Sequence, residues 1–208
     1  QGPGQEYARS FSYTPGVISQ EGVFLANSSA WYPQFADGMV SFRLNIQAPT
    51  DWDIVSQGTL VSEQKTATTQ SVIWEERHPQ DDIYIVAGRY QRYAQSTGAV
   101  NALVYLRSAD EALAQKYLDT TAQYIAMYNK LLGPYPYTKF ALVENFWETG
   151  YGMPSFTLLG PKVIRFPFIL HSSYPHEILH NYWGNGVFVD YAKGNWAEGL
   201  TAYLADHL

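Results

Sequence analysis

Two histidines near the C-terminal end of the sequence stand four positions apart and enclose a glutamate, in the order His176-Glu177-Ile178-Leu179-His180. On an α-helix this spacing places both imidazoles on one face, so both could bind one ion at the roughly 2 Å that a zinc–nitrogen bond requires. Glu177 is rotated by about 100° from His176 on such a helix. Its carboxylate would stand beside the ion and could accept a proton from a bound water. The spacing therefore predicts metal-assisted hydrolysis.

A catalytic zinc needs a third protein ligand and one open position for water. Glu198 is the best candidate, because it begins a further helix that could pack antiparallel to the first. Asp190 and Asp206 are rivals: Asp190 is expected to stabilise a turn, and Asp206 to contact a ligating histidine. His171 and His78 are expected to be structural. The chain has no cysteine, which excludes disulfides and thiolate ligands.

The ligands require two helices to carry them. Ser172 or Ser173 is expected to cap a helix that begins near Pro175 and runs through His180. A last helix is expected from Glu198 onward, after the segment 195–197. A longer helix is predicted upstream, where Ser108 and Glu111 form a capping box and Gly133 with Pro134 ends the helical pattern.

The remaining pattern is that of β-strands. Apolar and polar residues alternate from Val40 to Ile46, and short apolar pieces recur from residue 11 to residue 78, as in an antiparallel sandwich. Later strands are expected at 83–93, 100–106, 140–146 and 157–169, with a tight loop at Gly150–Pro154. The predicted fold class is α+β, with a β-rich segment at 1–78 and a strand-and-helix segment at 79–208.

Composition excludes some classes of function. The net charge of -6 and scattered basic residues argue against nucleic acid as a partner, which would require a basic surface. No run of eighteen apolar residues occurs, so no membrane span is expected in this segment. Localisation is unknown from these features.

The string His176–Asn185, followed by Asn195–Gly199, resembles the gluzincin core of the aminopeptidase N family of zinc metallopeptidases. The segment Glu148–Pro154 resembles the substrate-binding edge loop of that family. The resemblance covers residues 79–208. It implies part of an N-terminal antiparallel β sandwich, followed by the first half of a thermolysin-like catalytic domain.

Carried over position by position, the resemblance implies one zinc ion bound by His176, His180 and Glu198, with Glu177 as the general base. Gly152, Met153 and Pro154 would line the groove for a peptide or protein substrate. The backbone of the edge segment would hold an extended peptide by strand addition. The family is often secreted or membrane-attached, which mildly favours a location outside the cytoplasm.

The sequence departs from the family pattern at two places. The segment between His180 and Glu198 is one residue shorter than the family usually has, a change that loop shortening can absorb. Pro154 stands where the family has the acid that binds the free amino terminus of the substrate. Pro can neither carry charge nor donate a hydrogen bond, so amino-terminal trimming would need Glu144 or Glu148 as a substitute.

The resemblance places the tyrosine that stabilises the transition state beyond Leu208. The chain is therefore expected to be a segment of a longer protein and to have little activity alone. Three functions stay open: an aminopeptidase-like zinc peptidase, an endopeptidase, and a non-catalytic zinc-containing module that binds peptides.

Overall fold

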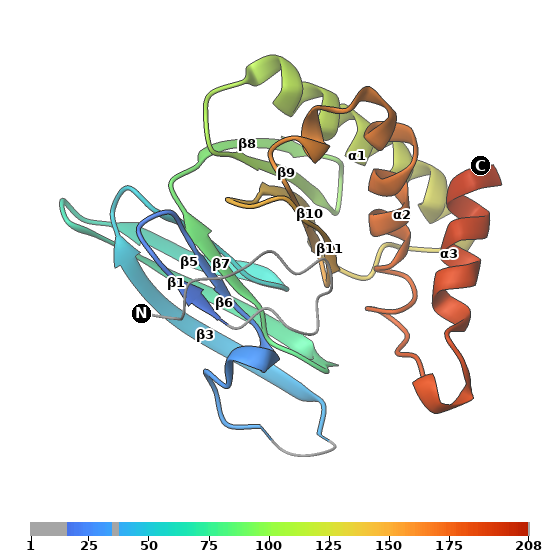
Figure 1. Ribbon diagram of the computed structural model, residues 1–208, viewed down its shortest axis with the longest axis horizontal. Coiled ribbons are helices and arrows are strands. Elements are labelled where there is room, and N and C mark those ends of the chain that lie inside the picture. The colour runs from blue at the N-terminus through green and yellow to red at the C-terminus, as the bar shows by residue number, and fades with distance from the viewer. Residues whose placement is uncertain (1–15, 35–37, 208) are drawn as a thin grey trace. The chain divides into compact units, whose positions relative to one another are not determined.

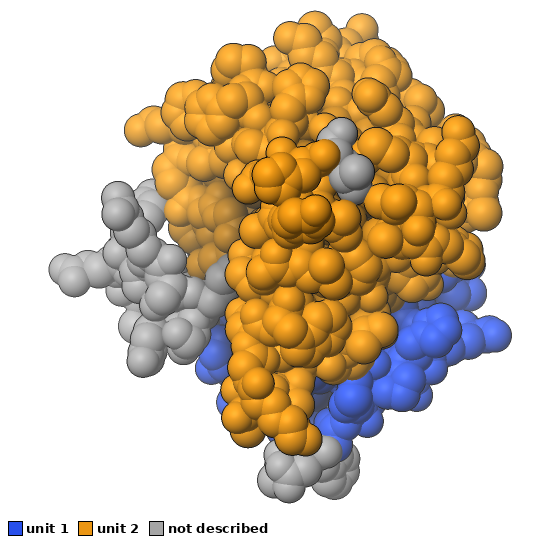
Figure 2. Space-filling model, turned by 90° about the vertical axis from the view of Figure 1, so that its right-hand side faces the viewer, with its two compact units in different colours: residues 1–90 blue, residues 91–208 orange. Residues whose placement is uncertain are grey.

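The computed structural model describes residues 16–34 and 38–207 (Figure 1). The chain divides into two units, residues 1–90 and 91–208, which are coloured separately in Figure 2. The boundary expected after His78 falls inside a strand that runs to Gln80, and the next strand pairs within the first unit. The division therefore lies after Tyr90.

The first unit contains two antiparallel sheets. One has the strand order β1-β2-β7-β4, formed by Val17–Ile18, Val23–Leu25, Ile85–Gly88 and Asp53–Val55. The other has the order β3-β6-β5, formed by Val40–Pro49, Thr69–Gln80 and Thr59–Lys65. Strands β5 and β6 are antiparallel neighbours joined by a hairpin connection of residues 66–68.

Both sheets contribute to one apolar core, as a β sandwich requires. Leu44 and Ile46 of β3 pack with Trp74 of β6 and with Ile54 and Ile85 of the other sheet. The Trp74 indole is fully buried and donates a hydrogen bond of 3.1 Å to the Ile54 carbonyl. Apolar and polar residues thus alternate along β3 because one face of this strand lies in the core.

The second unit is built on a mixed sheet with the order β11-β12-β10-β9-β8. Its inner strands β9, β10 and β12 run parallel, and the two outer strands run antiparallel to their neighbours. In chain order the strands are β8 (Gln91–Ser96), β9 (Asn101–Leu106), β10 (Lys139–Glu144), β11 (Gly150–Met153) and β12 (Phe156–Leu159).

Three strand predictions need correction. The segment 83–93 is not one strand, because β7 and β8 belong to different units. Residues 150–153 form an edge strand rather than a loop, since they pair with β12 despite two glycines. The apolar run 157–169 is a strand only as far as Leu159, because Gly160 and Pro161 break it and two 3-10 helices follow.

Helices cover this sheet. They are α1 (Glu111–Leu132), α2 (Ser173–Leu179) and α3 (Trp196–His207), with short 3-10 helices η3 (Val163–Arg165), η4 (Pro167–His171) and η5 (Tyr191–Lys193). Helix α1 packs on β8 and β9, and α2 contacts α1, α3 and β11 (Figure 1). Among the described residues, no helix is long and apolar enough to cross a membrane. The α+β fold class is confirmed.

The helix starts differ from those predicted. Asp110, not Ser108, caps α1, accepting a hydrogen bond of 3.0 Å from the Leu113 amide. The hydroxyl of Ser172 does not cap α2 but donates to the Phe168 carbonyl. Helix α3 begins at Trp196, two residues before Glu198.

Candidate metal centre

His176, Glu198 and His180 converge at the surface between α2 and α3. The two histidine Nε2 atoms lie 2.9 Å apart. Each lies 3.2 Å from a different carboxylate oxygen of Glu198. Among the described His, Asp and Glu residues, these are the three grouped closely enough to hold one metal ion, with candidate atoms all within 4.8 Å of one another.

The spacing of these atoms fits a tetrahedral zinc site. Two ligand atoms bonded at about 2.05 Å in tetrahedral geometry lie about 3.3 Å apart. The observed separations of 2.9 and 3.2 Å are close to that value. Two imidazoles and one carboxylate are also the donor set of a catalytic zinc, which leaves the fourth position for water. The residues present therefore fit this ion.

Local sequence places Glu198 at the start of its helix. The side chain of Asn195 accepts a hydrogen bond of 3.4 Å from the Glu198 amide, as an N-terminal cap does. Ala197 and Thr201 are buried on the side of α3 that packs on α2, while the Glu198 side chain is 54% exposed. The carboxylate thus reaches the histidines from a helix end open to solvent.

The His180 ring is held from the side opposite to Glu198. Its Nδ1 atom lies 3.5 Å from the Thr201 hydroxyl, which accepts a hydrogen bond of 2.7 Å from the Trp183 indole. A proton on Nδ1 could be donated to the Thr201 hydroxyl, and that tautomer would leave the Nε2 lone pair for a metal.

Glu177 lies against the edge strand β11. A Cβ atom added at Gly152 would overlap the Oε2 atom of Glu177 and stand 3.2 Å from its Cδ. Glycine here allows the strand and the carboxylate to approach closely, whereas a larger residue would displace the carboxylate or the strand. Glu177, which follows the candidate ligand His176 directly, could therefore act as a base on a molecule bound along β11.

Burial and neighbouring charge act on these groups. Desolvation, with a further contribution from the Glu198 carboxylate, raises the pKa of Glu177 to about 8. Desolvation and the nearby His176 lower the pKa of His180, and the Glu198 carboxylate has the smaller, opposite effect of raising it. A bound divalent cation would favour the ionised carboxylate and the neutral imidazole.

The other residues predicted to line the groove lie on the same hairpin. Gly152 keeps some exposed surface, whereas Met153 and Pro154 are buried. Within the part of the chain that the structure describes, β11 is the last strand of its sheet and pairs with β12. Their roles in substrate binding remain predictions.

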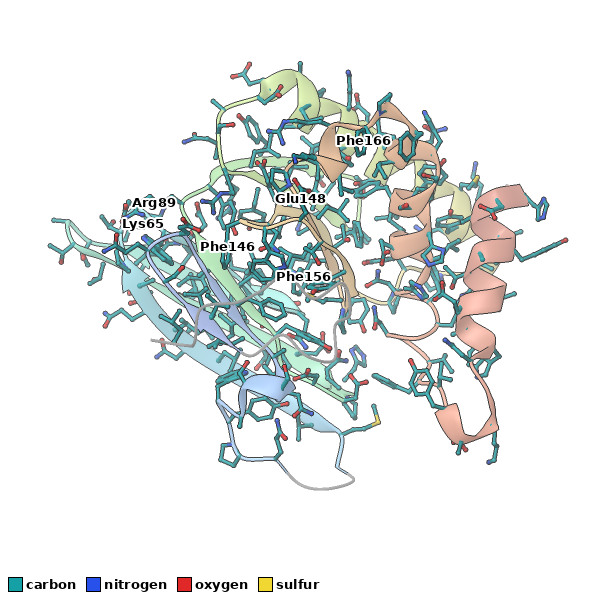
Figure 3. The ribbon with its side chains drawn as sticks, in the orientation of Figure 1. Lys65, Arg89, Phe146, Glu148, Phe156 and Phe166 are labelled. Carbon is teal, nitrogen blue, oxygen red and sulfur yellow. The ribbon has the colours of Figure 1, made fainter. Side chains whose placement is uncertain are left out.

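The structure gives other partners to three of the rival and substitute acids. Asp190 caps η5 and pairs with Lys193 at 3.0 Å, as expected of a turn residue. Glu144 is buried and accepts hydrogen bonds from Arg165 and from the Arg107 amide. Glu148, labelled in Figure 3, accepts one of 3.1 Å from the Lys162 amide.

The sequence reasoning missed two residues that contact the candidate site. Thr201 supports His180, and the signal was its position three residues after Glu198, on nearly the same face of α3. Asn181 follows His180 directly and bonds to the β11–β12 turn. Only the folded chain reveals that contact, because the two residues are far apart in sequence.

No protein-family model matches the sequence, and no curated protein matches it. Among solved structures, the chain is similar to an M1 zinc metallopeptidase from Deinococcus radiodurans, with a TM-score of 0.62 at 13% identity, covering 89% of this chain and 45% of that one. A mutant M1 zinc metallopeptidase from that organism, bound to a Tyr-Ser-Ala substrate, is similar with a TM-score of 0.60 at 12% identity. That match covers 80% of this chain and 39% of the mutant enzyme. A two-domain M1 zinc metallopeptidase mutant bound to L-arginine is similar with a TM-score of 0.61 at 11% identity. That match covers 84% of this chain and 43% of the other.

The chain thus spans less than half the length of the solved structures that it resembles. At these identities the likeness concerns the fold. That fold is the one found in part of M1 zinc metallopeptidases, and the His-His-Glu group lies within it.

Proposed function

We propose that this chain is the zinc-binding part of a metallopeptidase that hydrolyses peptide bonds. The observation that carries the proposal is the convergence of His176, His180 and Glu198 at zinc-like separations. The fold shared with M1 zinc metallopeptidases supports it, as does the Tyr-Ser-Ala substrate bound to one of the similar structures.

The roles of the residues follow from their positions. His176, His180 and Glu198 would hold the ion, which when bound makes water more acidic and polarises a carbonyl group. Glu177 would accept the proton of the attacking water and return it to the leaving amine. The edge strand β11 would hold the peptide as an added strand, with Gly152 admitting the backbone close to Glu177.

The direct test is peptide hydrolysis by the intact protein and its Glu177→Gln variant, with zinc content measured in both. We expect the variant to keep its zinc and to lose activity by at least about 10²-fold, within the range for a general base. Equal hydrolysis by both proteins would contradict the proposed role of Glu177. Zinc binding without hydrolysis in either protein would favour a non-catalytic peptide-binding module.

An endopeptidase is the second candidate, favoured by the state of the nearby acids. Pro154 carries no charge, and Glu144 and Glu148 already accept hydrogen bonds from other parts of the chain. Neither acid is therefore a ready partner for a substrate ammonium group. Parallel assays on a peptide and its N-acetylated form separate the candidates: equal cleavage supports the endopeptidase, and strong preference for the free amine supports the aminopeptidase.

A further inference from the structure

A buried chain of hydrogen bonds joins the turn between β11 and β12 to the C-terminal end of α2. The Lys139 Nζ atom donates to the Ser155 Oγ atom at 2.6 Å, and the Ser155 amide donates to the Asn181 Oδ1 atom at 2.6 Å. The Asn181 Nδ2 atom then donates to the Glu177 carbonyl at 2.9 Å. Ser155 and Asn181 have no exposed surface, and Lys139 is 3% exposed.

Asn181 uses both ends of its amide in this chain. The oxygen accepts from the turn, and the nitrogen donates to the Glu177 carbonyl and, at 3.3 Å, to the Ile178 carbonyl. Carbonyls in the last turn of a helix lack partners within the helix, so a side chain that satisfies them also fixes where the helix stands. One buried amide therefore sets the separation between the turn and α2.

The turn itself is held in a conformation that needs support. Ser155 has φ 68°, the left-handed region that a residue with a Cβ atom disfavours. Lys139 secures it from β10, with its ammonium 5.5 Å from the ring of Phe156. The turn is thus bonded on one side to the sheet and on the other to Asn181.

These contacts bear on the site because β11 and α2 also meet at Gly152 and Glu177. A Cβ atom at position 152 would overlap the Glu177 carboxylate as it stands, so that side chain or the strand would have to shift. A peptide added along β11 would meet the Glu177 carboxylate only if the gap between Gly152 and Glu177 is kept. We propose that Asn181 is a positioning residue that fixes the distance between Glu177 and the edge strand. The proposal rests on the function proposed above.

Asn181→Leu in the intact protein tests this, because the leucine side chain has the same branched arrangement of heavy atoms and makes no hydrogen bond. We expect kcat per zinc-loaded folded molecule to fall roughly 10- to 100-fold, as for a reacting group displaced by about 1 Å, with KM and zinc affinity changed less than about threefold. Asn145→Leu is the matched control: Asn145 is also fully buried, and among the described residues its amide atoms have no hydrogen-bond partner. The control should keep its kcat.

A double-mutant cycle adds a measurement that needs no activity. Gly152→Ala should lower the unfolding midpoint of the wild-type protein, because the methyl group collides with Glu177 while the gap is fixed. In the Asn181→Leu background the strand can move away, so the same substitution should lower the midpoint less. Coupled substitutions are non-additive, whereas independent ones add. If Asn181→Leu does not fold, Asn181→Asp, which keeps an acceptor for the Ser155 amide, replaces it with the same expectations.

The outcomes separate this proposal from the proposed function. Additive effects on the midpoint, or a normalised kcat equal to that of wild type, would overturn the positioning role while leaving the peptidase intact. A wild-type protein that hydrolyses no peptide would overturn the function. The cycle measured on unfolding would still decide whether Asn181 fixes the gap.

Discussion

Thr201 stands between the His180 ring and the Trp183 indole, with its oxygen 2.7 Å from the indole nitrogen and 3.5 Å from the His180 Nδ1 atom. The hydroxyl accepts from the indole and has a second lone pair for an Nδ1 proton. Such outer contacts orient a ligating imidazole and fix its tautomer. The affinity of this site for a metal therefore depends on a residue outside the His-Glu-x-x-His motif.

Thr201→Val keeps the shape of the side chain and removes both hydrogen bonds. We expect zinc affinity to fall about 10- to 100-fold, because the His180 ring loses its support. Competition with a chromophoric chelator measures the affinity. Thr201→Ser, which retains the hydroxyl, is the control and should bind zinc as the wild type does. Unchanged affinity in the valine variant would contradict the role of Thr201 in orienting the ring.

At the scale of the elements, the site depends on how α1, α2 and β11 are terminated and paired. Helix α1 packs against α2, and the Asp110 carboxylate caps the start of α1. The capping-box pattern in the sequence favoured Ser108 as the cap. The structure uses Asp110, whose side chain accepts from the Leu113 amide, so the helix begins later than the pattern predicted.

Asp110→Ala should lower the free energy of unfolding by about 1 kcal/mol, the usual loss for a removed N-cap. Chemical denaturation monitored by circular dichroism measures the change. Ser108→Ala removes the cap that the sequence pattern favoured and should leave stability within about 0.5 kcal/mol of wild type, as for an exposed surface position. A larger loss from the serine variant than from the aspartate variant would contradict the observed cap.

Local patterns predicted those elements whose signals are local. The spacing of His176 and His180 and the Gly133 stop depend on nearby residues, and α2 and the end of α1 agree with them. Edge strand β11 could not be found this way, because Gly150 and Gly152 disfavour a strand and only pairing with β12 makes one. The contact between Gly152 and Glu177 is likewise a product of the folded sheet.

At the scale of the whole molecule, the candidate site joins segments that are separate in the chain. His176 and His180 come from α2 and its C-terminal end, Glu198 comes from α3, and a loop with the 3-10 helix η5 lies between them. An ion that needs ligands from both helices binds the folded chain more tightly than the unfolded chain. Metal binding should therefore raise the free energy of unfolding.

Removal of zinc should lower the thermal unfolding midpoint, and its return should restore it. At a zinc concentration about 100 times the dissociation constant, the expected gain is about 2.7 kcal/mol. Calorimetry with and without chelator measures it. Magnesium, which prefers oxygen ligands, should give no comparable gain. His176→Ala should abolish the zinc response; a response of equal size in that variant would place the stabilising metal elsewhere.

The central claim is that two imidazoles and one carboxylate share a single ion, and zinc titration with analysis of stoichiometry tests it most directly. We predict one zinc per chain in the wild type, much weaker binding in His176→Ala and Glu198→Ala, and unchanged binding in Asp190→Asn, an acid that caps η5 instead. Binding that survives the loss of Glu198, or that is lost with Asp190, would contradict the account.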